Sequence, residues 1–141
     1  MASLDLARLE GTTGFLLRLA QLRVYDEFHA RLDAMGITPT RYSILGVIHD
    51  NPGCRPHEIA DALRLKRPNL ATLQAQLERE GLVARQEEEG RAVRLRLTSD
   101  GEQLFARLAH IVEGLDHGLT ETLSEAERAT LHALLRRLVH P

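Results

Sequence analysis

The segment between residues 66 and 80 carries side chains that can bind duplex DNA. Apolar residues at helical spacing, Leu70, Leu73 and Leu77, predict a helix that turns these three side chains inward. Asn, Gln and Thr on the remaining surface can hydrogen-bond base edges, and Arg or Lys at the start of a helix can meet a phosphate or a guanine. The candidate contacts are Lys66, Arg67, Asn69, Thr72 and Gln76. Taken alone, this helix is equally consistent with a solvated polar face.

A second candidate for DNA contact lies in the sequence "EEEGRAVRLRLTSDG". Alternation of Val and Leu with Arg over residues 93–97 predicts a strand with one apolar face, and Gly90 supplies the backbone freedom of a turn. Residues 82–98 are therefore predicted to form a hairpin with Arg91 at its tip. A tip arginine can enter a minor groove, where the potential is most negative. Glu89 can hold Arg91 in position through an ion pair.

The other charged residues of the hairpin have a simpler explanation. For Arg94 and Arg96 we expect the solvated outer face of a strand. For the acidic run at residues 87–89 the alternative to a role beside DNA is a disordered loop that keeps the protein soluble.

Apolar periodicity and cap signals predict the elements that must position these residues. Thr38 is a sound N-cap with Pro39 in the first turn, and Gly36 is expected to close the preceding helix. Two pairs have capping-box spacing, Ser99 with Glu102 and Ser124 with Glu127. The expected order is helices over 14–34, 39–50, 56–63 and 68–80, the hairpin over 82–98, and helices over 99–118 and 125–139.

Composition and length indicate an ordinary globular protein, with one compact domain or a core with an extension. Of the 141 residues, 43% are hydrophobic and 27% are charged, with a net charge of −2. Residues 55–98 carry nine Arg or Lys and seven Asp or Glu, so this part is locally basic within an acidic frame. No apolar run approaches the roughly 18 residues of a membrane span. The start of the chain lacks a secretory signal and Cys54 is the single cysteine, so we expect a cytoplasmic protein without membrane association.

The last two expected helices carry more apolar residues than a small winged domain can cover. Such surface usually finds a partner subunit, which predicts a homodimer. The residues concerned are Leu104, Leu108, Ile111, Val112, Leu115, Leu131, Leu134, Leu135 and Leu138.

In three stretches the chain resembles the MarR family of bacterial winged helix-turn-helix transcription regulators. They are "ITPTRYSILGVIHDNPGCRPHEIADAL", "LKRPNLATLQAQLEREGLVARQ" and "GRAVRLRLTSDG". The resemblance implies a mainly α fold with a small β-hairpin, in a single domain over residues 1–141. The winged helix-turn-helix core would span about 38–98, and dimerisation helices about 10–35 and 99–139. It also implies an obligate homodimer that binds a pseudo-palindromic operator in double-stranded DNA and is usually released by a small effector.

The resemblance also assigns roles to individual residues. Arg67, Asn69, Thr72 and Gln76 fall where the family's recognition helix meets the major groove, and Arg91 falls on the family's wing-tip arginine. The family's usual wing aspartate is Glu89 here, in a shorter loop. Arg64 stands where a glycine is frequent. Arg55, which we include among the DNA contacts, occupies an N-cap position where Ser or Thr is common.

An effector site is predicted from the first long helix. Arg18, Tyr25 and His29 share one stripe of that helix, and Tyr42 of the next helix could approach it. In the family such a junction forms the effector pocket, and these residue types suit an aromatic acid or its coenzyme A thioester. The alternative is that Tyr and His cap the core while Arg18 makes an intersubunit ion pair.

Sensor and enzyme functions have weaker support. Cys54 is followed by Arg55, which would favour a thiolate, although a lone cysteine is more often a small core residue. His110 and His117 share a helical face but are about 10.5 Å apart along the axis, too far to hold one zinc ion. Neither a phosphate-binding glycine loop nor a nucleophile elbow is found. We therefore expect no enzyme, no cofactor and no metal.

The sequence thus favours a DNA-binding transcriptional repressor that is homodimeric and released by a ligand. Two alternatives stay open at this point. One is a protein-interaction dimer that does not bind DNA, and the other is a thiol or metal sensor on the same frame.

Overall fold

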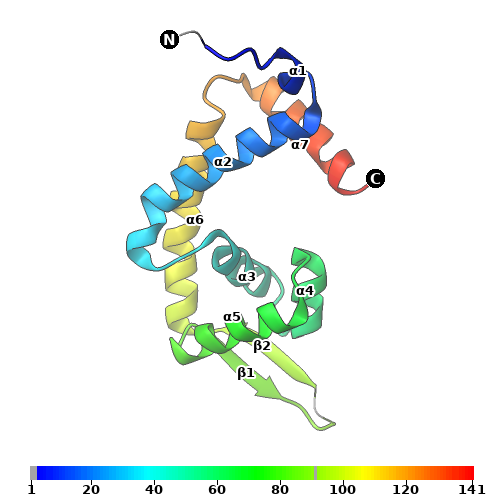
Figure 1. Ribbon diagram of the computed structural model, residues 1–141. Coiled ribbons are helices and arrows are strands. Elements are labelled where there is room, and N and C mark those ends of the chain that lie inside the picture. Colours follow the sequence, from blue (N-terminus) through cyan, green and yellow to red (C-terminus); the bar gives the residue numbers. More distant parts are fainter. Residues whose placement is uncertain (1–2, 91) are drawn as a thin grey trace. The chain divides into compact units, whose positions relative to one another are not determined.

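The computed structural model describes residues 3–90 and 92–141, and it has the expected mainly α fold with one antiparallel hairpin (Figure 1). The elements are α1 (Ala7–Glu10), α2 (Thr13–Leu32), the 3-10 turn η1 (Asp33–Met35), α3 (Pro39–Asp50), α4 (Pro56–Leu63), α5 (Arg67–Arg79), β1 (Val83–Glu87), β2 (Val93–Leu97), α6 (Ser99–Leu119) and α7 (Glu125–Val139). Every element expected from the sequence is present within a few residues. The short α1 was not predicted, because one helical turn carries no periodic signal.

The described residues form two compact units. The terminal unit lies within Met1–Ala30 and Val112–Pro141, and the central unit lies within Arg31–Ile111. The winged core expected over residues 38–98 lies wholly within the central unit.

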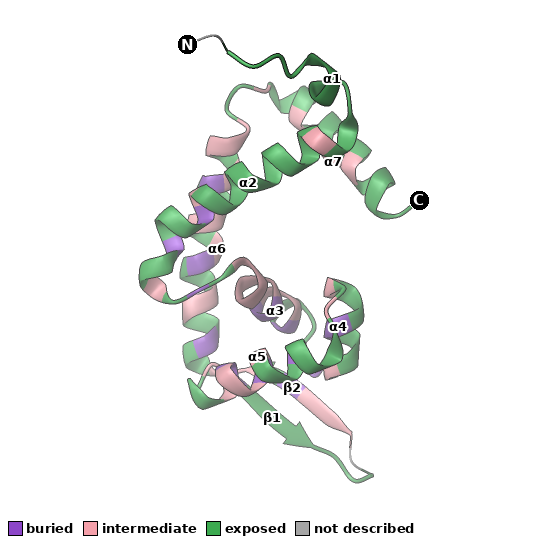
Figure 2. Cartoon of the chain, viewed as in Figure 1, coloured by how far each residue is buried: buried purple, intermediate pink, exposed green. Residues whose placement is uncertain are grey.

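The central unit has a core that joins three helices to the hairpin. α3 packs against α4 and β2, while α5 packs against α4 and β1. This core includes buried residues of both α3 and α5, which Figure 2 marks by colour. It contains Leu32, Ile37, Ile44, Leu45, Ile48, Ile59, Ala60, Leu70, Leu77, Val83, Leu95 and Leu108. The apolar positions that predicted these helices are thus the ones that hold them together.

The hairpin is extended by a short third segment from the turn between α3 and α4. β1 and β2 pair in antiparallel register from Val83 opposite Leu97 to Glu87 opposite Val93. The Gly53 N–H donates to the Leu95 carbonyl over 2.8 Å, and the Leu95 N–H donates to the Cys54 carbonyl over 2.9 Å. These two bonds attach the wing directly to the turn that precedes α4.

Most of the expected helix caps are confirmed. The Arg41 N–H donates to the Thr38 hydroxyl at 3.2 Å, and Gly36 ends η1 with a left-handed φ of 67°. At the start of α7, the Glu127 N–H donates to the Ser124 hydroxyl at 3.1 Å and the Ser124 N–H donates to the Glu127 carboxylate at 3.0 Å. This reciprocal pair is the capping box that the sequence predicts.

The expected capping box between Ser99 and Glu102 is wrong. Thr98 caps α6 instead, because its hydroxyl accepts the Gly101 N–H at 3.0 Å. Glu102 is left to pair with His49, whose Nδ1 lies 2.6 Å from the carboxylate. Thr98 and Ser99 are adjacent and both carry a hydroxyl, so the sequence does not show which of them is the N-cap.

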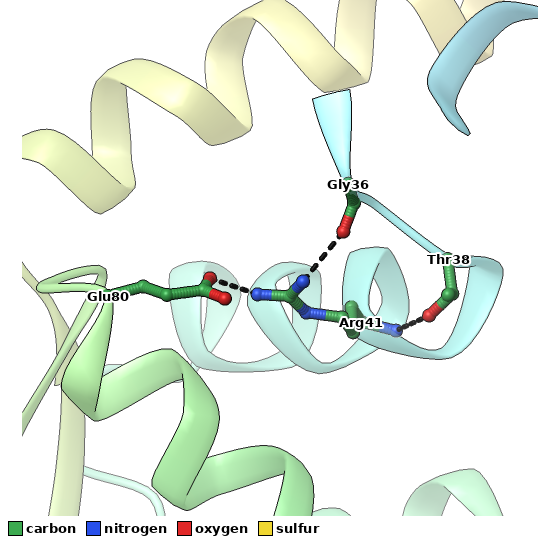
Figure 3. A network of polar contacts seen from close by, with 4 residues as sticks. All are labelled: Gly36, Thr38, Arg41 and Glu80. Carbon is green, nitrogen blue, oxygen red and sulfur yellow. Dashed lines mark hydrogen bonds and ion pairs between the residues drawn. The ribbon is translucent and has the colours of Figure 1, made fainter. Parts of the chain in front are cut away.

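Arg41 ties the start of α3 to the end of α5 (Figure 3). Its guanidinium donates to the Gly36 carbonyl at 2.6 Å and pairs with the Glu80 carboxylate. The Arg41 side chain is only 12% exposed, whereas that of Glu80 is 47% exposed. Replacing the arginine would therefore remove a mostly buried side chain together with both of its interactions, whereas replacing the glutamate would change only a half-exposed carboxylate.

We expect Arg41→Ala to lower the free energy of unfolding by about 1–3 kcal/mol, because it removes the charged hydrogen bonds of a mostly buried guanidinium. Glu80→Gln should cost less than about 1 kcal/mol, because its half-exposed carboxylate is screened by solvent. Urea unfolding of both variants measures the difference. Arg85→Ala, which breaks an exposed pair on β1, is the matched control, and an Arg41→Ala cost no larger than that of the control would contradict the assignment.

Candidate nucleic-acid interface

The inner face of α5 fixes which side chains it exposes. Leu70 and Leu77 are buried, as expected, and Leu73 is half-buried. The sequence did not indicate that Gln74 is buried too, with 8% of its surface exposed. Its Nε2 lies 3.4 Å from the Glu78 carboxylate one turn further on. A polar residue therefore completes the inner face of the helix.

The predicted DNA contacts lie on the outer surface of α5. Arg67, Asn69 and Thr72 are exposed and Gln76 is half-buried. The Thr72 hydroxyl donates to the Pro68 carbonyl at 3.1 Å, which leaves its lone pairs to accept a hydrogen bond. Lys66 is exposed at the N-cap, where it provides no side-chain cap. The first N–H groups of α5 therefore keep the partial positive charge that favours an anion.

Two helix starts meet around a surface hollow of about 320 Å³ in the central unit. It is lined by Pro56 and His57 of α4 and by Arg67, Leu70, Ala71 and Gln74 of α5. The sequence did not indicate His57 as a site residue, because its position near Arg67 depends on how α4 and α5 pack. Arg67 and His57 are both exposed, so this edge of the helix pair presents a guanidinium and an imidazole.

Both ends of α4 carry an arginine where another residue is usual. Arg55 is the exposed N-cap, and its backbone N–H donates to the Glu58 carboxylate at 2.8 Å. A guanidinium accepts no hydrogen bond, so only this half of a capping box can form. Arg64 ends the helix with a left-handed φ of 54°. That conformation explains why glycine would suit the position.

The structure describes only part of the charge arrangement expected in the wing. Arg91 lies outside the described residues, and so does its expected pairing with Glu89, which is exposed. Gly90 has a φ of 89°, which confirms its role in the turn. Glu87 pairs with Arg85 at 3.0 Å on β1.

The expectation of a solvated face for the two strand arginines holds for Arg96 and is wrong for Arg94. Arg96 is exposed, whereas Arg94 is half-buried. Arg94 Nη1 donates to the Gly53 carbonyl at 3.1 Å, and its Nε lies 2.8 Å from the Glu88 carboxylate. The attachment of β2 to the turn after α3 brings these partners into reach, and alternation alone could not reveal it.

Cys54 does not have the reactive setting that the neighbouring arginine suggested. It is buried and pairs with Leu95 through the backbone. Burial raises the pKa of the Cys54 thiol, and the Glu58 carboxylate raises it further. The expectation that Arg55 favours a thiolate is therefore wrong, and a small core residue describes Cys54 better.

The expected effector residues divide between the two units. In the terminal unit, Arg18, Tyr25 and His29 are all exposed, and the Tyr25 and His29 ring centroids are 6.4 Å apart. In the central unit, Tyr42 stacks on Phe105 at 5.6 Å. Burial raises the pKa of Tyr42, and Asp50 adds to the effect. Tyr42 thus has a packing role within its own unit.

Neither a metal-binding cluster nor a membrane-spanning helix is present in residues 3–90 and 92–141. No group of three or more His, Cys, Asp or Glu side chains there could hold a metal ion. Within the same residues, no helix combines the length and the apolar character needed to cross a membrane.

The helix pair, the exposed polar face of α5 and the attached hairpin define a winged helix-turn-helix DNA-binding protein. The model of the MarR family matches residues 35–92. A protein of Thauera aromatica that is named as a transcriptional regulator for the hcr operon is 35% identical over 97% of this chain and 87% of its own length. The chain belongs to the MarR family, and it is a transcriptional regulator of the MarR type.

Two solved structures of the transcriptional repressor CouR are similar over nearly the whole chain. The one bound to a 23-mer DNA duplex is 30% identical with a TM-score of 0.92, covering 99% of this chain and 100% of that one. The one bound to p-coumaroyl-CoA is 31% identical with a TM-score of 0.87, covering 98% and 99%. The family resemblance and the expected fold are therefore confirmed.

The buried thiol leads to a prediction about chemical reactivity. Because only the thiolate is alkylated, iodoacetamide should label Cys54 at neutral pH at least about tenfold more slowly in the folded protein than in urea. Mass spectrometry of the labelled protein measures both rates. Equal labelling rates would contradict a core role for Cys54. DNA binding that peroxide weakens in the wild-type protein but not in Cys54→Ser would contradict it too.

Proposed function

We propose that this regulator is a homodimeric repressor that binds a pseudo-palindromic operator and is released by a small ligand. The observation that carries the proposal is the exposed polar and basic face of α5 beside the attached wing. It is supported by the similarity to CouR, which was solved bound to duplex DNA. The proposed DNA contacts are Arg55, Lys66, Arg67, Asn69, Thr72, Gln76, Glu89 and Arg91.

These contacts divide by the information they carry. Lys66 and Arg67, at the positive start of α5, would neutralise phosphates and set the position of the helix on the duplex. Asn69, Thr72 and Gln76 would reach base edges in the major groove, where amide and hydroxyl groups discriminate between base pairs. Such a division lets a protein of net charge −2 bind DNA, because the anion meets only the basic part of the surface.

Dimerisation through the terminal unit would place two such surfaces on one DNA face. The large apolar residues that are exposed among the described residues all belong to this unit. They are Leu4, Leu6, Leu9, Leu16, Leu17, Leu19, Leu22, Val24, Tyr25, Leu131, Leu134, Leu138 and Val139. Apolar surface of this extent favours a partner subunit. In this proposal residues 10–35 and 99–139 supply dimerisation helices around a winged core at 38–98.

Release would follow from differential binding of an effector. Two recognition helices reach successive major grooves only when they are about 34–36 Å apart. A ligand that binds a different spacing more tightly shifts the population away from the DNA-bound form. CouR was solved with p-coumaroyl-CoA, which supports an aromatic acid or its coenzyme A thioester as the ligand class here. Tyr25, His29 and Arg18 on α2 are the proposed contacts in the terminal unit.

Two variants of α5 should weaken DNA binding in different ways. Lys66→Ala should reduce the slope of log affinity against log salt by about 0.9, the loss of one phosphate contact. Gln76→Ala should leave that slope unchanged and reduce the preference for operator over unrelated duplex by about 1–3 kcal/mol. Fluorescence anisotropy over a salt series measures both quantities. Arg107→Ala on α6 removes an exposed positive charge as the control, and equal effects from all three variants would contradict the proposed surface.

The proposed dimer interface can be tested at two exposed leucines of α7. Leu134 and Leu138 are 50% and 59% exposed on α7, so Leu134→Glu with Leu138→Glu should shift the protein from dimer to monomer, because a charge on a buried apolar surface is costly. Sedimentation analysis measures the mass. Arg136→Glu, also exposed on α7, is the control for added negative charge. A wild-type monomer at micromolar concentration would contradict the proposed assembly.

A further inference from the structure

Arg94 connects three segments of the central unit through its side chain. Backbone hydrogen bonds connect only some of these segments. It belongs to β2, it donates from Nη1 to the Gly53 carbonyl at 3.1 Å, and its Nε lies 2.8 Å from Glu88 Oε1. Gly53 belongs to the turn between α3 and α4, and Glu88 follows the end of β1. The Arg94 side chain is 34% exposed, so about two thirds of it is shielded from water.

The side-chain link reaches further along the wing than the backbone link does. The backbone bonds between Gly53, Cys54 and Leu95 attach the middle of β2 to the turn before α4. Glu88 lies beyond them toward the tip, where its N–H donates to the Ala92 carbonyl at 2.9 Å. Arg94 therefore connects the outer part of the wing to the segment that leads into α4.

We propose that Arg94 is a positioning residue for DNA binding, which holds the outer wing against the α3–α4 turn by bridging Glu88 and the Gly53 carbonyl. The inference rests on the proposed binding of DNA by the wing. By this inference, the Glu88 carboxylate favours DNA binding, although DNA is itself an anion. Glu87 has no such part, because its partner Arg85 is on the same strand and both side chains are well exposed.

The alternative for Arg94 is a direct contact with a DNA phosphate. The two functions make opposite predictions for Glu88. If Arg94 meets a phosphate, Glu88 competes for it, and Glu88→Gln should raise affinity by removing a repulsive charge. If Arg94 positions the wing, Glu88→Gln weakens the bridge and should lower affinity. The sign of the change separates the two functions.

The experiment measures affinity for the duplex fragment that the wild-type protein retains most tightly from genomic DNA. Glu88→Gln should weaken binding about threefold or more, whereas the control Glu87→Gln, which removes the same charge one residue away, should leave affinity equal or higher. Arg94→Ala should weaken binding with no change in the slope of log affinity against log salt. Loss of one phosphate contact would instead change that slope by about 0.9.

If Arg94→Ala does not fold, Arg94→Lys tests the same bridge. Arg94→Lys retains the charge but not the planar fork that reaches two partners, so it should bind as weakly as Glu88→Gln does. In the double variant with Glu88→Gln, the two losses should not add, because they remove one interaction. Rescue by lysine, a changed salt slope, or tighter binding by Glu88→Gln would each overturn the inference. A wild-type protein that retains no fragment would overturn the proposed function first, and this inference with it.

Discussion

The pairing of Leu95 with the turn at Gly53 and Cys54 is the constraint on which the central unit depends. Without it, the hairpin would be held only by the packing of β1 on α5 and of β2 on α3 and α4, because a two-stranded ribbon is marginally stable by itself in water. With it, the wing becomes part of the same core as α3, α4 and α5. The left-handed Gly53, at a φ of 85°, lets the turn reach the strand. The burial of Cys54 and the partners of Arg94 both follow from this attachment.

Local signals predicted the elements, and tertiary pairing decided the roles of individual side chains. The helix over 56–63 and the cap at Thr38 could be predicted because periodicity and cap chemistry are local. The setting of Cys54, the bridge made by Arg94 and the inclusion of His57 beside Arg67 could not. Each depends on how separate elements pack against one another. The error at Ser99 is of another kind, since two adjacent hydroxyl residues compete for one cap.

The charge distribution reconciles an acidic protein with an anionic partner. Basic side chains gather at the starts of α4 and α5, whereas Glu87 and Glu88 on the wing are paired with arginines. The helix start adds the partial charge of its free N–H groups. The unit that carries these features has its own core, while the terminal unit exposes apolar surface. The two units thus have surfaces suited to different partners.

We propose that this regulator recognises a two-fold symmetric site in duplex DNA. The most direct measurement is selection of genomic DNA fragments on the purified protein over a series of salt concentrations, followed by sequencing. We expect a common imperfect palindrome whose half-sites are about one helical turn apart, with retention that falls steeply as salt rises. Retention of no fragment above background at low salt, or of fragments without a shared symmetric site, would contradict it.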